Sequence, residues 1–282
     1  MPSRQNTYLF ATDLHGQRNR YESLSEKISA VEPAALFLGG DLLPHRLEDT
    51  FIEQVLIPGF AALKARMADR YPQVYLILGN DDPRIFESAI QETEEIGLWS
   101  YVHNRNVSMG KYSLYGYACV PPTPFLLKDW ERYDVSRYCD PGCVSPEDGI
   151  RTVAVDNDEI RWGTIENDLT RLTGLDDMRR AIFLFHSPPY DTALDRAALD
   201  GKFVDHAPLD VHVGSIAIRR FIEQKQPRLT MHGHVHEAAR ITGEWMTTIG
   251  RTVCISAAHD GPELALVSLD LENPENSTRE LI

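Results

Sequence analysis

The chain has 282 residues, of which 43% are hydrophobic, so it can bury the core of one large domain or two small ones. No run approaches the roughly 18 consecutive apolar residues of a membrane span, and the first residues contain no apolar signal region. The formal net charge of −14 argues against a non-specific nucleic-acid surface, which would need an excess of Lys and Arg.

The first hundred residues alternate between strand and helix patterns. We expect strands at 8–11, 35–38 and 74–78, each followed by a helix, at 17–31, 52–69 and 84–96. The strand patterns are apolar on both faces, which is typical of a sheet covered on both sides. This alternation predicts parallel strands joined by right-handed crossovers.

After residue 101 the pattern becomes richer in β segments. We expect β segments at 106–108, 112–118, 181–185, 228–231, 252–256 and 264–269, and helices at 159–172 and 214–224. Residues 120–156 are rich in Pro, Asp and aromatic residues and predict a long loop, either a functional lid or a disordered segment. Without a repeat or linker, we expect a single domain over 1–282 with an inserted loop at about 120–156.

The four cysteines are few and irregularly spaced. They are Cys119, Cys139, Cys143 and Cys254. Cys139 and Cys143 lack the two-residue gap of a zinc motif and have no second pair. The pattern favours the reducing cytoplasm over a disulfide framework.

Residues that can ligate metals follow five of the predicted strands. In chain order they are Asp13, His15, Asp41, Asn80, His186, His234 and His236. Side chains at the carboxyl ends of parallel strands converge on one crevice. Carboxylates, an amide and imidazoles gathered there predict a site for two divalent cations.

Each position also has a simpler interpretation. Asp41 suits a helix N-cap, Asn80 suits a left-handed turn, and His186 suits a buried core position. Short motifs taken singly carry a high risk of false matches, but five in order favour ligation. His232 is expected to be a bystander of the last histidine cluster or a partner of a ligand.

The ordered set D-x-H, G-D, G-N-[HD]-[DE], H and G-H-x-H, from Asp13 to His236, resembles the calcineurin-like metallophosphoesterase superfamily. The resemblance implies an α/β fold, a four-layer αββα sandwich with mixed sheets flanked by helices. It also implies a first metal held by Asp13, His15, Asp41 and His236. The second metal would be held by Asp41, Asn80, His186 and His234, with the Asp41 carboxylate bridging.

Such a centre implies two divalent metal ions. Mixed nitrogen and oxygen ligands suit Mn, Fe or Zn. A bridging carboxylate lets the two ions lie about 3.5–4 Å apart, where a water between them becomes a nucleophile at neutral pH.

The chain departs from the family pattern after Asn80. Many members have a His there that protonates the leaving group or binds the phosphate, whereas this chain has Asp81 followed by Asp82. A carboxylate cannot be a permanent cation, so Asp81 would act only when protonated, or would bind metal or water. We consider His45 and His212 as replacement proton donors, and Asp82 as a residue supporting the site.

The segment 121–132 is the most individual part of the chain. In one interpretation, Lys128 or Arg132 reaches a phosphate and Trp130 stacks on a base. In the other, the prolines stiffen a surface loop and the aromatic residues attach it to the core. The sequence favours the structural role for any single residue and the functional role for the loop as a whole.

The sequence therefore predicts a binuclear metal-dependent phosphoesterase that hydrolyses a phosphodiester by attack of metal-bound hydroxide. The alternatives are a phosphomonoesterase or nucleotide pyrophosphatase, and a catalytically silent scaffold that binds partners. Because all seven ligand positions carry competent side chains, we favour an enzyme. We expect a small phosphate-ester substrate, no nucleic acid, no membrane and a cytoplasmic location; the oligomeric state stays open.

Overall fold

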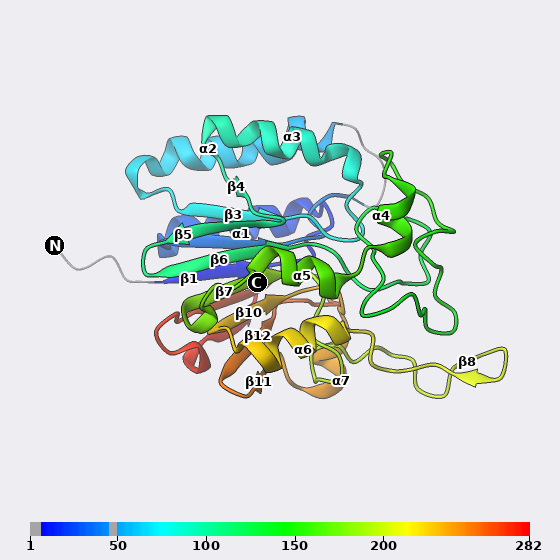
Figure 1. Ribbon diagram of the computed structural model, residues 1–282. Helices are drawn as coiled ribbons and strands as arrows, with labels where there is room; N and C mark the ends of the chain where they lie inside the picture. Colours follow the sequence, from blue (N-terminus) through cyan, green and yellow to red (C-terminus); the bar gives the residue numbers. More distant parts are fainter. Residues whose placement is uncertain (1–6, 45–49) are drawn as a thin grey trace.

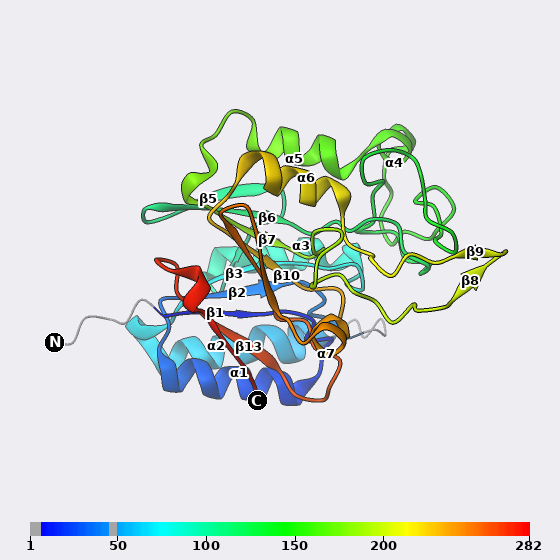
Figure 2. The ribbon, with the colours of Figure 1, turned by 90° about the horizontal axis from the view of Figure 1, so that it is seen from below.

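Two six-stranded sheets lie face to face in the computed structural model, which describes residues 7–44 and 50–282. Helices α1 and α2 cover the outer face of one sheet, and α5 and α6 cover the outer face of the other (Figure 2). The predicted four-layer αββα sandwich is confirmed. Among the described residues, no helix has the length and apolar character that a membrane span requires.

The first sheet contains the predicted N-terminal strands. Its strand order is β14 (Thr278–Leu281), β13 (Ala265–Leu269), β1 (Tyr8–Ala11), β2 (Ala35–Gly39), β3 (Gln73–Ile77) and β4 (Ser100–Tyr101). Strands β1 to β3 are parallel, as predicted, and β4, which was not predicted, continues the parallel order. Strand β13 pairs antiparallel with β1 and with β14. Every residue of β2 is buried, which agrees with a sheet covered on both faces.

The second sheet is built from the later part of the chain. Its strand order is β11 (Met246–Ile249), β12 (Thr252–Ser256), β10 (Leu229–His232), β7 (Ala181–Phe185), β6 (Tyr112–Tyr117) and β5 (Arg105–Met109). The four central strands are parallel and the two edge strands are antiparallel to their neighbours. A small hairpin, β8 (Phe203–Val204) and β9 (Ala207–Pro208), extends away from both sheets (Figure 1).

The five predicted helices are present, but those predicted at 52–69, 84–96 and 159–172 are interrupted, and α7 (Ala238–Thr242) was not predicted. The helices are α1 (Arg18–Val31), α2 (Ile57–Met67), α3 (Glu87–Glu92), α4 (Asn157–Trp162), α5 (Ile165–Thr173), α6 (Ile216–Lys225) and α7. A π-helical turn, η1 (Ile52–Leu56), precedes α2 because Pro58 has no N–H to donate to the preceding turn. The predicted helix 159–172 divides at Gly163, since Asp156 and Thr164 each cap a helix of their own.

Short 3₁₀ turns complete the elements. They are η2 (Ala68–Arg70), η3 (Arg84–Phe86), η4 (Thr93–Ile96), η5 (Met178–Arg180) and η6 (Pro274–Asn276).

The inserted segment 120–156 is held together by its own backbone hydrogen bonds. Val120 donates its N–H to the carbonyl of Trp130 over 2.9 Å, and Lys128 donates to Ile150 over 2.8 Å. The segment lies beside α4 at one end of the sheets (Figure 1). These contacts make it a folded loop that closes on itself.

Asp134 attaches this insertion to the second half of the chain. Its carboxylate accepts hydrogen bonds from Ser215 Oγ at 2.6 Å and from the N–H groups of Ile216 and Ala217 at 2.6 and 3.2 Å. These N–H groups belong to the first turn of α6, where a negative charge is favourable.

We therefore expect Asp134→Ala to lower the free energy of unfolding by about 2–3 kcal/mol, because hydrogen bonds to a charged acceptor are lost. Urea unfolding would measure the change. Asp158→Ala, at an exposed residue in the first turn of α4, is the control and should change stability by less than about 1 kcal/mol. Equal stability of the two variants would contradict the attachment.

Candidate metal centre

The backbone that carries the candidate ligands has an unusual conformation. Asp13, His15, Asp41 and His234 have φ values of 56°, 48°, 52° and 72°, in the left-handed region. Each such non-glycine residue costs on the order of 1–3 kcal/mol and persists only where its surroundings enforce it. Four of them in one place therefore mark these strand ends as a functional site.

Two glycines next to the ligands leave no room for a side chain. A Cβ on Gly40, which has φ of 97°, would lie 2.7 Å from His186 Nδ1. A Cβ on Gly79 would lie 2.7 Å from His186 Cε1 and would also collide with the Asp41 carboxylate. The G-D and G-N pairs thus let the loops after β2 and β3 close around His186.

One group of donors gathers around Asp13. Asp13, His15, Asp41 and His236 each offer a ligand atom, and these atoms all lie within 4.8 Å of one another. His236 Nε2 lies 3.1 Å from His15 Nε2 and 3.2 Å from Asp13 Oδ1. Asp13 Oδ2 is buried and has no hydrogen-bond partner within residues 7–44 and 50–282. A divalent cation between these atoms would satisfy the carboxylate oxygen and both imidazole nitrogens.

A second group gathers around His186. Its Nε2 lies 3.2 Å from Asp41 Oδ2 and 3.0 Å from Asn80 Oδ1. The ring of His234 lies close by, with 5.4 Å between the two ring centroids. Asp41 therefore takes part in both groups, which is the arrangement a bridging carboxylate requires.

Neighbouring groups orient two of the imidazoles. His186 Nδ1 donates to the carbonyl of Gly39 over 2.8 Å, which leaves Nε2 to face the ligand cluster. Asp81 Oδ2 lies 3.9 Å from His15 Nδ1, and the Asp81 N–H donates to Asp41 Oδ1 over 2.8 Å. Asp81 thus contacts two of the candidate ligands.

The carboxylates and imidazoles balance one another's charge. Burial lowers the pKa of His186, but Asp41 outweighs it and raises that pKa to about 10. Burial also lowers the pKa of His236, but the hydrogen bond and the charge of Asp13 outweigh it and raise that pKa to about 9. Burial and the nearby His186 lower the pKa of His234 to about 3. Without metal at pH 7, His186 and His236 are therefore imidazolium ions beside the carboxylates of Asp13 and Asp41.

Asp82, another predicted catalytic residue, has a structural role. Asp82 is fully buried, and its carboxylate accepts N–H bonds from Leu42, Leu43 and Gly79 at 3.1, 2.7 and 2.9 Å. It therefore supports the loops and cannot reach a leaving group. Burial and the Asp41 charge raise its pKa to about 8.

His212 is not brought to the ligand cluster. Its Nδ1 lies 2.8 Å from Asp195 Oδ1, and it lines a cavity with Asp191 and Arg219. Among the described residues that line this cavity, none is a candidate metal ligand. His45 lies outside the described residues.

The predicted substrate contacts of Lys128 and Trp130 are not supported. Both side chains are buried; Lys128 Nζ pairs with Glu131 and donates to the carbonyl of Thr123 over 2.9 Å. Trp130 Nε1 donates to the carbonyl of Asp82 over 2.7 Å. The structural interpretation of the loop therefore holds for these two residues.

Arg132 is also held within the protein. It pairs with Glu159, and its Nε lies 3.0 Å from Asp168 Oδ2. These carboxylates fix the guanidinium group away from the ligand cluster.

Arg20, which no sequence motif singled out, supports the centre from α1. Arg20 is buried; it donates to the carbonyl of Asp13 over 2.5 Å and to that of Gly261 over 2.6 Å. Its position four residues before Leu24, on the buried face of α1, was the available signal. His232, by contrast, has both ring nitrogens engaged, by Ser187 and Thr230.

Comparison with known proteins identifies the family. The model of the calcineurin-like phosphoesterase family matches residues 7–238. The chain therefore belongs to the calcineurin-like phosphoesterase family, whose members are metal-dependent phosphoesterases that typically have a binuclear centre.

Solved structures show the same fold at low sequence identity. The protein TT1561 of Thermus thermophilus is 17% identical, with a TM-score of 0.57 and 98% of each chain covered. A dimetal phosphatase from Danio rerio is 11% identical, with a TM-score of 0.52, and the match covers 93% of this chain and 92% of that one. No curated protein sequence matches this chain.

Metal binding should release protons, because His186 and His236 must be neutral to act as ligands. At pH 7 we expect binding of Mn to release about two protons and to tighten as pH rises toward 9. Calorimetry in buffers of different ionisation heat would count the protons.

The same pKa values set the stability of the metal-free protein. The pKa values of His186 and His236 are both raised above the unfolded value of about 6.5. Their contribution to the free energy of unfolding is therefore complete below pH 6.5 and is lost as pH rises through about 9–10. Metal binding without proton release at pH 7 would contradict this charge balance.

Proposed function

We propose that the chain is a binuclear metal-dependent phosphodiesterase. The observation that carries this proposal is the pair of donor groups that share Asp41, one of which contains the unpartnered oxygen of Asp13. We further propose that it acts on small phosphate esters in the cytoplasm, as the net charge and cysteine content predict.

The first cation would be held by Asp13, His15, Asp41 and His236, and the second by Asp41, Asn80, His186 and His234. Divalent Mn, Fe or Zn bound there would lower the pKa of a water and place positive charge against the phosphoryl oxygens.

The residues of the chain set the charge and access of this site. Asp13, Asp41 and His186 are nearly inaccessible, whereas the side chains of Asp81 and His236 are 28% and 32% exposed. A substrate would therefore approach past Asp81 and His236. Asn80 supplies a neutral oxygen, which keeps the site positive enough to attract an anion.

Asp81 favours a diester over a monoester. A phosphate monoester carries a charge of about −1.5 to −2 at pH 7, whereas a diester carries a single charge. The Asp81 carboxylate at the mouth of the site repels the doubly charged ester more strongly. In addition, the residue at this position is an aspartate, so it adds no imidazole to the mouth of the site.

Two other functions stay as alternatives. A phosphomonoesterase or nucleotide pyrophosphatase would use the same centre with another leaving group. We disfavour a catalytically silent scaffold. Four possible ligands lie within 4.8 Å of one another, and Asn80 and His234 lie beside His186, which supports an enzyme.

The proposal is tested with metal-free protein reconstituted with Mn. We expect kcat/KM for bis(p-nitrophenyl) phosphate to exceed that for p-nitrophenyl phosphate by about tenfold or more, a difference of about 1.4 kcal/mol. A preference for the monoester would favour the phosphomonoesterase. Two bound metals without hydrolysis of either ester would favour the scaffold.

Asp41→Asn tests the shared ligand. Because the amide cannot bridge two cations as a carboxylate does, we expect occupancy of both metals to fall and kcat/KM to drop about a hundredfold or more. Mass spectrometry of the bound metals, together with the diester assay, measures both effects. Asp205→Asn, at the exposed tip of the β8–β9 hairpin, is the matched control. Two metals and full turnover in Asp41→Asn would contradict the bridging role.

A further inference from the structure

A second cavity lies between the inserted segment and the turn that begins at Arg84. Its volume is about 80 Å³. The charged residues that line it are the cations Arg84, Lys128, Arg132 and Arg151 and the carboxylates Asp129, Glu131 and Glu159. Water occupies about 30 Å³ in the liquid, so this cavity has room for a group of only a few heavy atoms. Arg84 begins the turn η3, whereas Arg132 and Arg151 both come from the inserted segment.

The cavity adjoins the candidate metal centre without sharing a ligand with it. Trp130 Nε1 donates to the carbonyl of Asp82, and Arg84 lies over the Trp130 ring at 5.2 Å from its centroid. Trp130 and Asp82 therefore stand between the cavity and the loop that carries Asn80. None of the seven candidate ligands lines the cavity.

Two of the three guanidinium groups keep unused donors. Arg151 donates from Nη1 to the carbonyl of Pro146 over 2.6 Å and forms no ion pair with the residues that the structure describes. Arg84 uses Nε to bind Glu87 at 3.0 Å, and its terminal nitrogens form no hydrogen bond within the described part of the chain. Arg132, by comparison, is already paired with carboxylates.

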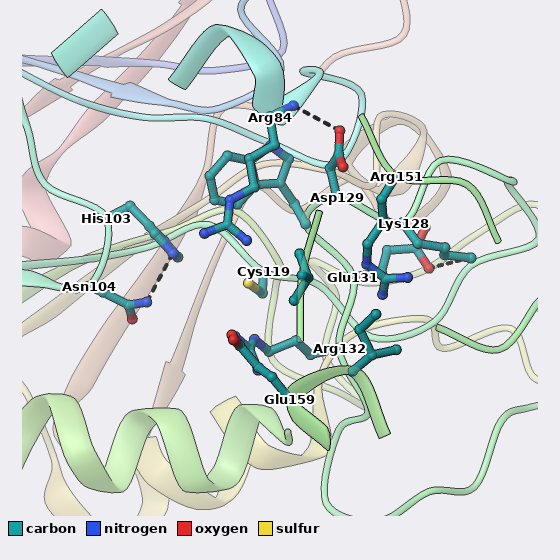
Figure 3. A pocket seen from close by; sticks show the side chains of 13 residues that line it. Arg84, His103, Asn104, Cys119, Lys128, Asp129, Glu131, Arg132, Arg151 and Glu159 are labelled. Carbon is teal, nitrogen blue, oxygen red and sulfur yellow. Dashed lines mark hydrogen bonds and ion pairs between the residues drawn. The ribbon is translucent and has the colours of Figure 1, made fainter. Parts of the chain in front are cut away.

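Figure 3 shows how these groups face one another. Arg84 enters the cavity from one side and Arg151 from the other, with Cys119 between them and Arg132 below. A guanidinium group presents several N–H donors in one plane, which matches the oxygens of a phosphate. Two such forks directed into one small cavity match a single oxyanion.

The electrostatics of the neighbouring groups support this interpretation. Burial lowers the pKa of Arg151; the nearby Asp129 opposes this effect, and Arg132 and Arg84 lower the pKa further. Burial and the same two arginines also lower the pKa of His103 to about 3. Of the carboxylates that line the cavity, Glu131 is paired with Lys128 and Glu159 with Arg132, whereas Asp129 accepts the N–H groups of Arg84 and Thr152. Arg84 and Arg151 are therefore the lining cations that keep donors for an anion.

We propose that this cavity binds a phosphate-type oxyanion between Arg84 and Arg151. The anion is either free inorganic phosphate or the phosphate group of a small organic molecule. The site is independent of the reaction proposed for the metal centre.

Titration of inorganic phosphate into the Mn-loaded protein, followed by calorimetry, tests the site. We expect two binding events, one at the metals and one in the cavity. Arg151→Gln should weaken the second event about tenfold to a hundredfold, because charge-assisted hydrogen bonds are lost. Arg151→Lys should bind phosphate with an affinity between those of the wild type and Arg151→Gln, since lysine keeps the positive charge but lacks the planar set of N–H donors. Arg171→Gln, at an arginine whose side chain is 72% exposed, is the control.

Removal of the metals with a chelator separates the two events. The chelated protein should keep the event that depends on Arg151 and lose the other. Arg84→Gln, on a different segment, should reproduce the loss, so that a folding defect in one variant does not decide the result. Absence of saturable phosphate binding in the chelated protein, or unchanged binding in both variants, would overturn the proposal.

Glycerol phosphate in the same titration distinguishes the two sources of the anion. Tighter binding than inorganic phosphate, with the same dependence on Arg151, assigns the cavity to the phosphate group of an organic molecule. Weaker binding assigns it to the free ion.

Discussion

The arrangement of the candidate metal centre depends on the buried carboxylate of Asp82. Its two oxygens accept the N–H groups of Leu42, Leu43 and Gly79, and so join the loop after β2 to the loop after β3. These loops carry Asp41 and Asn80, and the Asp82 side chain helps to fix their separation together with the hydrogen bond from the Asp81 N–H to Asp41. Burial disfavours the charged form of this side chain, and burial together with the Asp41 charge raises its pKa to about 8. Because Trp130 binds the carbonyl of Asp82, the inserted segment is anchored to the same residue.

A second constraint is the balance of charge inside the centre. Two carboxylates that are almost inaccessible to water, Asp13 and Asp41, would repel each other strongly if they were left alone. In the absence of metal, His236 and His186 offset them as imidazolium ions. Two divalent cations would take over that role, so proton loss and metal binding are linked at the same atoms. The left-handed backbone conformation of Asp13 and Asp41 is strained, and these contacts stabilise it.

The strands, and the polar residues that the fold gathers at their ends, could be predicted from the sequence because both are local signals. Apolar runs such as β2 end in a polar ligand, and this pattern needs no tertiary knowledge. The edge strands β11 and β14 were missed because they are only partly buried and show no clean alternation. The positions of Asp82 and Lys128 could not be predicted, since their roles depend on partners that the fold supplies. A buried lysine paired with Glu131 looks in sequence like a surface cation.

The topology of the second sheet explains why two anion-attracting regions lie side by side. Strand β6 is the parallel neighbour of β7, with Tyr117 opposite Phe185, and the His186 N–H donates to the carbonyl of Tyr117 over 3.1 Å. The residues that follow these strands must therefore emerge at the same edge, where ligand sites of α/β sheets form. His186 leads from β7 into the metal centre, while Cys119 leads from β6 into the arginine-lined cavity. The inserted segment follows directly after β6, so it is placed to close that cavity and to supply Arg132 and Arg151 to it.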